Sequence, residues 1–210
     1  ASSHSTTDGS GGCILKKLMC ALALTLASVG GSVGAATINV ATGDTYTVIA
    51  PTTIDGPSSV DTGGTLENQS ELTNDGTLTN TGVLINRFGS TLTNDISATL
   101  TNEVGGELSN AGTLTNEGDL TNAGVLTNAG TFSIMAGSQV TGVGTITQSA
   151  GTLTVNGDMT QSAVTINGGT LAGNGTITSP VTVNNATVSA GVSPLTAGTL
   201  NIVGDLDVLG

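Results

Sequence analysis

The titratable side chains that could carry chemistry in this sequence are few and nearly all acidic. Asp and Glu total 15 residues, Lys and Arg total 3, and the formal net charge is −12 at pH 7. Three carboxylates, Asp95, Glu103 and Glu107, follow the pair Arg87-Phe88 within one short segment. Paired carboxylates cleave glycosidic bonds, one as the acid and the other as the base or nucleophile. A polysaccharide-processing enzyme is therefore one function that this segment allows.

Most other catalytic chemistries lack their residue types after residue 35. The single histidine is His4, and the two cysteines are Cys13 and Cys20. Nucleophilic sites that pair Ser or Cys with His, and zinc sites of imidazole or thiolate, are thereby excluded from the later chain. Sugar-processing sites also use aromatic platforms, whereas the chain has no Trp, one Tyr and two Phe. We therefore predict that the chain is not an enzyme and that it binds no cofactor or metal.

The charge distribution also restricts the partners. Arg87 is the only Lys or Arg after residue 17, and every carboxylate except Asp8 lies after residue 35. Binding to nucleic acid requires cations that replace the counterions of the phosphate backbone. This sequence offers one such cation in its acidic part, so we predict no nucleic-acid partner.

A six-residue repeat, G-T-L-T-N-x, forms the elements that carry these groups. Leu recurs in steps of six or eight residues, and an Asn follows each Leu by two positions. The repeated leucines are Leu66, Leu72, Leu78, Leu84, Leu92, Leu100, Leu108, Leu114, Leu120 and Leu126. The asparagines are Asn68, Asn74, Asn80, Asn86, Asn94, Asn102, Asn110, Asn116, Asn122 and Asn128. Residues i and i+2 of a strand share a face, so each hexad predicts a short strand with Leu and Asn inward.

Strands this short bury their Leu only by stacking on one another. Three hexads per coil would bring Leu onto Leu with a rise of about 4.8 Å and would let the Asn amides form a ladder. The Asn-x-Gly that closes each unit is turn chemistry. We therefore predict an all-β fold, a right-handed parallel β-helix (β-solenoid) of about 8–9 coils.

The chain divides into four predicted segments. Residues 1–35 are a leader with a signal peptide, because Lys16-Lys17 precede an apolar run and then small residues, with cleavage expected after Ala35. Residues 36–64 are the N-terminal cap of the solenoid, and residues 65–135 are the hexad solenoid. Residues 136–210 form a less regular third.

Three consecutive eight-residue steps, from Leu84 to Leu108, interrupt the hexad and are expected to widen a single coil. Insertions in solenoids map to loops that often bind partners. The candidate partner-binding rim comprises Arg87, Phe88, Asp95, Glu103 and Glu107. The alternative is that these are tolerated loop variants whose acids keep the corners soluble.

The C-terminal third resembles the passenger domains of bacterial autotransporters. That family has G-T-L-x-G-x-G-T-I, commonly followed by V-T-V-x-x-G-A-T-V-S-P-G-x-S-P-G-T-L-T-V-x-G-D-L. The matching segments are 169–177, 181–183, 186–189, 193–194, 198–200 and 204–206, whereas Ala190 replaces the family's Pro. The resemblance implies a β-helix displayed at the surface of a Gram-negative cell, with an outer-membrane barrel expected beyond the chain end. We therefore predict an exported adhesin or structural stalk with a host or cell-surface ligand.

Ice binding is the alternative function, because outward Thr-x-Thr pairs flank the inward Leu residues. The pairs are Thr77/Thr79, Thr91/Thr93, Thr99/Thr101, Thr113/Thr115, Thr145/Thr147, Thr152/Thr154 and Thr176/Thr178. They resemble the flat Thr arrays of ice-binding β-solenoids. With three hexads per coil the pairs are expected on different faces, and Thr is also simply a good strand residue.

Overall fold

The computed structural model describes residues 33–191 and 197–209. These residues form 27 β-strands and no helix, which confirms the predicted all-β solenoid. Up to residue 32, the predicted signal peptide lies outside the described residues. Within them, no helix has the length and apolar character needed to cross a membrane.

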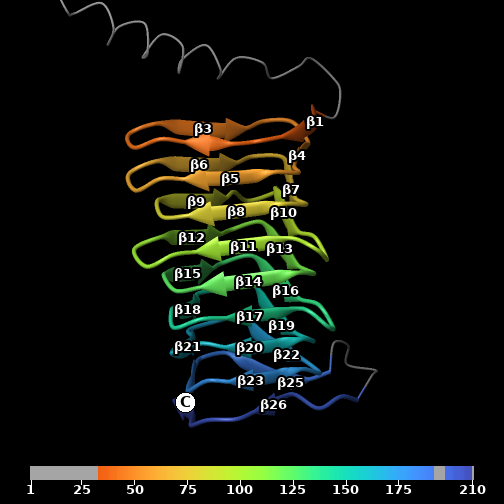
Figure 1. Cartoon of the computed structure of the whole chain (residues 1–210). Helices are drawn as coiled ribbons and strands as arrows, with labels where there is room; N and C mark the ends of the chain where they lie inside the picture. Colours follow the sequence, from red (N-terminus) through yellow and green to blue (C-terminus); the bar gives the residue numbers. More distant parts are fainter. Residues whose placement is uncertain (1–32, 192–196, 210) are drawn as a thin grey trace, which may run out of the picture.

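Three parallel sheets form the walls of the solenoid, and successive strands pass from one sheet to the next (Figure 1). Sheet A contains β1 (Val33–Ala36), β4 (Thr52–Ile54), β7 (Glu71–Asn74), β10 (Thr91–Asn94), β13 (Thr113–Asn116), β16 (Thr131–Ile134), β19 (Thr152–Val155), β22 (Thr170–Gly173) and β25 (Thr187–Ala190). Sheet B contains β2 (Asn39–Val40), β5 (Pro57–Val60), β8 (Thr77–Asn80), β11 (Thr99–Asn102), β14 (Asp119–Asn122), β17 (Gln139–Thr141), β20 (Asp158–Thr160), β23 (Thr176–Thr178) and β26 (Asn201–Ile202). Sheet C contains β3 (Thr45–Val48), β6 (Thr65–Asn68), β9 (Val83–Asn86), β12 (Glu107–Asn110), β15 (Val125–Asn128), β18 (Thr145–Gln148), β21 (Ala163–Ile166), β24 (Val181–Asn184) and β27 (Leu206–Leu209).

Each coil therefore contributes one strand to each sheet, and the three sheets have nine strands apiece. The pairing places equivalent repeat positions on top of one another, so Leu72, Leu92 and Leu114 stack within sheet A. All ten repeated Leu side chains are at most 1% exposed. Burying one Leu side chain contributes roughly 1.5–3 kcal/mol, so the stacked leucines supply a large share of the apolar stabilisation.

The inward Asn residues form three hydrogen-bonded ladders, one at each corner of the coils. The Nδ2 group of Asn74 donates to Oδ1 of Asn94 at 2.8 Å, and that of Asn94 donates to Oδ1 of Asn116 at 2.8 Å. The same donor also bonds a backbone carbonyl, as Asn74 does to Thr99 O at 2.9 Å. The buried Nδ2 groups are thus satisfied by the next coil or by the turning backbone, which keeps them inside at little cost. Within the three ladders, only the Oδ1 atoms of Asn74 and Asn80, at the heads of two of them, have no donor.

A narrow corner of two residues follows most hexads, and its glycine packs on the coil before it. A Cβ added to Gly130 would lie 2.1 Å from the carbonyl oxygen of Gly112, a distance that no side chain tolerates. The repeat needs Gly at this place because the backbones approach too closely for any other residue.

Residues 36–64 extend the same three sheets through β2 to β5, and their capping role stays a prediction. At the other end the inward-facing side chains of the last coil are partly uncovered. Val188, Leu206 and Val208 are 43%, 47% and 67% exposed, although each is paired in register with a buried residue of the coil before.

Candidate functional site

The three eight-residue steps form three four-residue corner loops in one coil, at residues 87–90, 95–98 and 103–106. The first joins sheets C and A, the second joins A and B, and the third joins B and C (Figure 1). Between Asn86 and Asn110 the coil is 24 residues long, against 18 between Asn68 and Asn86. Among the described residues this is the one coil with a four-residue loop at all three corners, and we call it the wide coil.

The three loops of the wide coil share one construction. The fourth residue of each donates its backbone N–H to the carbonyl of the first, as Ser90 does to Arg87 at 3.1 Å. The second residue of each is apolar and points to solvent. Phe88, Ile96 and Val104 are 92%, 77% and 78% exposed. Gly89 has a φ of +82°, so this turn requires the left-handed conformation that Gly adopts without cost.

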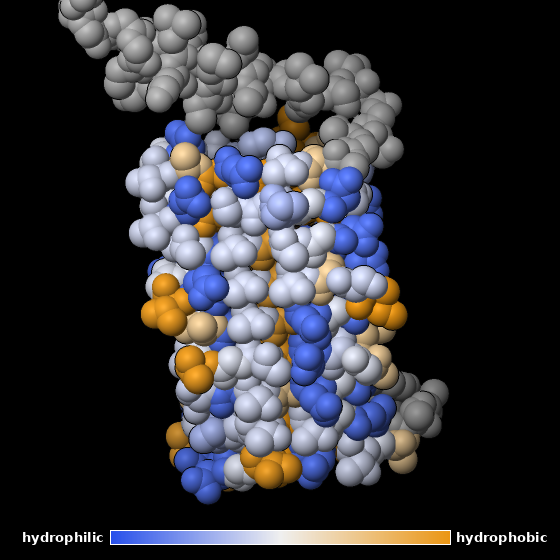
Figure 2. Space-filling view, in the orientation of Figure 1, coloured by the Kyte–Doolittle hydropathy of each residue, from blue (hydrophilic) through white to orange (hydrophobic). Residues whose placement is uncertain are grey.

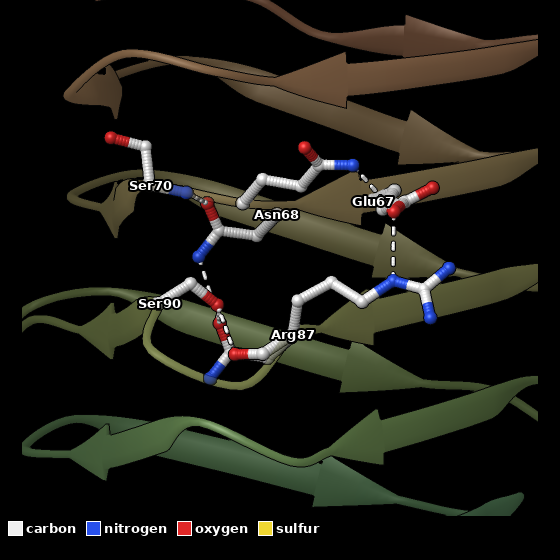
Figure 3. A network of polar contacts seen from close by, with 7 residues as sticks. Glu67, Asn68, Ser70, Arg87 and Ser90 are labelled. Atoms are coloured by element: carbon white, nitrogen blue, oxygen red, sulfur yellow. Dashed lines mark hydrogen bonds and ion pairs between the residues drawn. The ribbon is translucent and has the colours of Figure 1, made fainter.

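Arg87, the single cation after residue 17, is held in an ion pair (Figure 3). Its Nε donates to Oε1 of Glu67 at 2.7 Å, from the coil above. Gln69 donates its Nε2 to the same oxygen at 2.7 Å. The hydrogen bonds from Arg87 and Gln69 lower the pKa of the Glu67 carboxyl. Arg87 therefore joins two coils.

The structure distributes the predicted rim around the circumference of the solenoid. Arg87 and Phe88 occupy the C–A corner and Asp95 the A–B corner. Glu103 lies at the B–C corner, and Glu107 begins β12 just beyond it. In the described part of the chain, no group of three or more His, Cys, Asp and Glu residues is placed to hold a metal. The rim is a collar around one coil, with one apolar side chain and one charged side chain per corner.

A shallow open depression lies beneath the Phe88 loop on the C–A corner. The corners of the two coils that follow have only two residues each, at 111–112 and 129–130. The walls of the depression are formed by Phe88, Gly89, Ser90, Thr91, Ala111, Gly112, Thr113, Gly130 and Thr131. These residues offer backbone, methyl and hydroxyl groups and no charge.

The sheet topology also sorts the outward Thr-x-Thr pairs. The pairs 91/93, 113/115 and 152/154 lie on sheet A, the pairs 77/79, 99/101 and 176/178 on sheet B, and the pair 145/147 on sheet C. Sheet A additionally gathers Thr131 with Ser133, and Thr170, in register with these pairs. The sequence predicts these pairs on different faces. Each coil contains three repeat units, so the units of one sheet are every third unit along the chain, and this spacing is the signal that groups the pairs.

Comparison of the chain with protein-family models, with curated proteins and with solved structures finds no match.

Proposed function

We propose that the chain is an exported, non-enzymatic β-solenoid that acts at the cell surface as a rigid stalk of the autotransporter-passenger type. Its coils are proposed to wind in a right-handed helix. The hydrogen bonding of the coils is the observation that supports this role most directly. Each internal strand pairs with the coil before and the coil after, and between Asn68 and Asn128 the Asn ladders also tie the coils from inside. A rod bonded in this way is rigid along its axis, as a display stalk must be.

The passenger-type motif in the C-terminal third supports export. The chain is expected to cross the inner membrane by its residues 1–35 and to begin at Ala36 once processed. The test is expression of the complete chain in a Gram-negative host. Mass spectrometry of the product should find Ala36 at the N-terminus, and externally added protease should reach the protein on intact cells. A product that stays in the cytoplasm with residues 1–35 attached would contradict the proposal.

Adhesion is proposed to use the collar of the wide coil. Within the collar, the C–A corner is the favoured contact, because Phe88 is 92% exposed beside Arg87 and borders the shallow depression. Aromatic and Arg side chains are enriched among the residues that carry binding energy. The ligand would be a host or cell-surface molecule. Binding of the fluorescently labelled chain to host cells or to other bacteria should fall at least tenfold in a double variant, Arg87→Ala with Phe88→Ala.

The matched control is Met135→Ala, because residues 135–138 form another four-residue corner loop with a partly exposed apolar side chain. It should leave binding unchanged. If the double variant binds like the unaltered chain, the Arg87-Phe88 corner is not the adhesive surface. Polysaccharide processing is not needed to explain the Asp95, Glu103 and Glu107 carboxylates, since charged corners keep a β-solenoid soluble.

A further inference from the structure

The outer face of sheet A is a two-column array of hydroxyl groups. The strands pair in register, so the first outward residue of each strand lies next to the first outward residue of the strand in the coil before. The outward residues two positions later stack in the same way. The first column contains Thr91, Thr113, Thr131, Thr152, Thr170 and Thr187. The second contains Thr53, Thr73, Thr93, Thr115, Ser133, Thr154 and Ser189, with Ala172 as the single residue without a hydroxyl.

This face differs from the other two in its charge. From Thr91 to Ser189, no outward strand position of sheet A carries a charged or aromatic side chain. Sheet B, which faces the viewer in Figure 2, has a hydrophilic column in its lower half. There Asp119, Gln139 and Asp158 stack in register. Sheet C carries Glu107 beside the apolar Val83 and Val125.

The hydroxyls of the array are available to solvent. Among the described residues, no side chain of the two columns that follows Glu71 in the chain has a hydrogen-bond partner within the protein. The inward Asn side chains, in contrast, are bonded to one another. Each side chain is also at least partly exposed, except Ala172. A Thr hydroxyl can donate one hydrogen bond and accept two, so the face presents a regular set of sites to water.

The spacing of these sites suits ordered water. Neighbouring coils are about 4.8 Å apart along the axis. Water molecules linked tetrahedrally at about 2.8 Å have second neighbours about 4.6 Å apart. Two water molecules bound to hydroxyls on adjacent coils are therefore separated by nearly the distance between second neighbours in ice. The Thr methyl groups between the hydroxyls offer no competing polar partner.

From these observations we propose that the outer face of sheet A binds ice, in addition to any role of the molecule as a stalk. The absence of charge matters because an ionised side chain orders water around itself in a pattern foreign to the ice lattice. The absence of aromatic and planar amide groups disfavours a polysaccharide as the occupant, since sugars bind through stacking on aromatic faces and directed polar contacts.

One coil supplies a matched set of variants. Thr115, Thr121 and Thr127 occupy the same repeat position on β13, β14 and β15, so they lie on sheets A, B and C of one coil. Thr115→Lys should abolish adsorption to ice, because the lysine projects from the middle of the array. Thr121→Lys and Thr127→Lys change the net charge equally and should retain it. Circular dichroism melts of all three should show equal folding.

The measurements are thermal hysteresis and the fraction of labelled, processed chain that a slowly growing ice hemisphere incorporates. We expect incorporation well above that of a non-binding protein of similar charge, and at least a tenfold loss in Thr115→Lys alone. Exclusion of the unaltered chain from ice overturns the proposal. Equal losses in the three variants overturn the assignment to sheet A. Binding to microcrystalline cellulose that depends on Thr115, without binding to ice, would identify a polysaccharide surface instead.

Discussion

The hexad coils and the C-terminal coils fill the same interior position with different chemistry. From Asn68 to Asn128 every corner of the hexad coils points an Asn inward, and within each ladder the amide of one Asn bonds the Asn of the next coil. In sheet A the position changes to Ile134 and then to Val155, both fully buried. In sheet C it changes to Gln148 and then Ile166. One solenoid thus continues through two kinds of interior.

The difference explains why the sequence repeat is strict in one region and loose in the other. An Asn ladder restricts the side chain in every coil, because each Nδ2 needs a side-chain amide oxygen at the right height. At the foot of two ladders Gln148 and Gln161 supply that oxygen in place of Asn. Aliphatic side chains pack without such a requirement, and cores tolerate hydrophobic exchange when the volume is kept. The periodicity of the sequence therefore fades where the interior becomes apolar, while the strands and their register persist.

The largest expected effect comes from breaking a ladder in its middle. Asn102 accepts from Asn80 at 2.7 Å and donates to Asn122 at 2.8 Å. Asn102→Leu removes both bonds and leaves the buried Oδ1 of Asn122 without a donor, so we expect a loss of about 3 kcal/mol in the free energy of unfolding. Urea unfolding followed by circular dichroism measures it. A loss below about 1 kcal/mol would show that the ladders contribute little beyond packing.

The converse change places an amide in the apolar interior. Val155→Asn buries a side chain between Ile134 and Gly173, where the described structure offers no ladder partner, at a cost of about 2 kcal/mol. Ile134→Asn should cost less, because Asn116 lies directly above it and can extend its ladder by one coil. The comparison of the two urea midpoints tests this. Equal costs at both positions would mean that the neighbouring amide gives no help.

The heads of the ladders should tolerate change better than their middles. Oδ1 of Asn80 is buried without a partner, since Val60 lies above it. Asn80→Val removes this unpaired oxygen but leaves Oδ1 of Asn102 without its donor. The number of buried unsatisfied amide oxygens therefore stays the same, and we expect a loss of about 1 kcal/mol in the free energy of unfolding. At the head of the third ladder, Oδ1 of Asn68 accepts from the Ser70 N–H at 3.1 Å. Asn68→Val should therefore destabilise the chain more than Asn80→Val, and the reverse order would contradict this account.

The sequence predicted the repeat unit well because its information is local. Alternation within the hexad indicated that Leu66 to Leu126 and their Asn partners point inward, and three units per coil indicated which would stack. Counting every third unit then assigns the units to faces, and in the strict hexads this count places the strands of Glu71, Thr91 and Thr113 on one face. Beyond Phe132 the strict spacing of Leu and Asn ends, so the sequence does not delimit the units that continue the threonine array through Thr152 and Thr170. The same count puts Arg87, Asp95 and Glu103 in three successive corners, and the structure shows that these corners lie on three sides of one coil.

The smallest expected effect comes from the exposed contact that joins the same coils from outside. The hydrogen bond from Arg87 lowers the pKa of Glu67, so the pair stabilises the fold above the unfolded pKa of Glu67. This contribution is lost as the pH falls through the lower, folded pKa. Because Arg87 is half exposed, solvent screening keeps the contribution small compared with one rung of an Asn ladder. Arg87→Met should lower the urea midpoint slightly at pH 7 and not at pH 2.5. A difference that persists at pH 2.5 would mean that the arginine acts through packing of its aliphatic stem, and not through its charge.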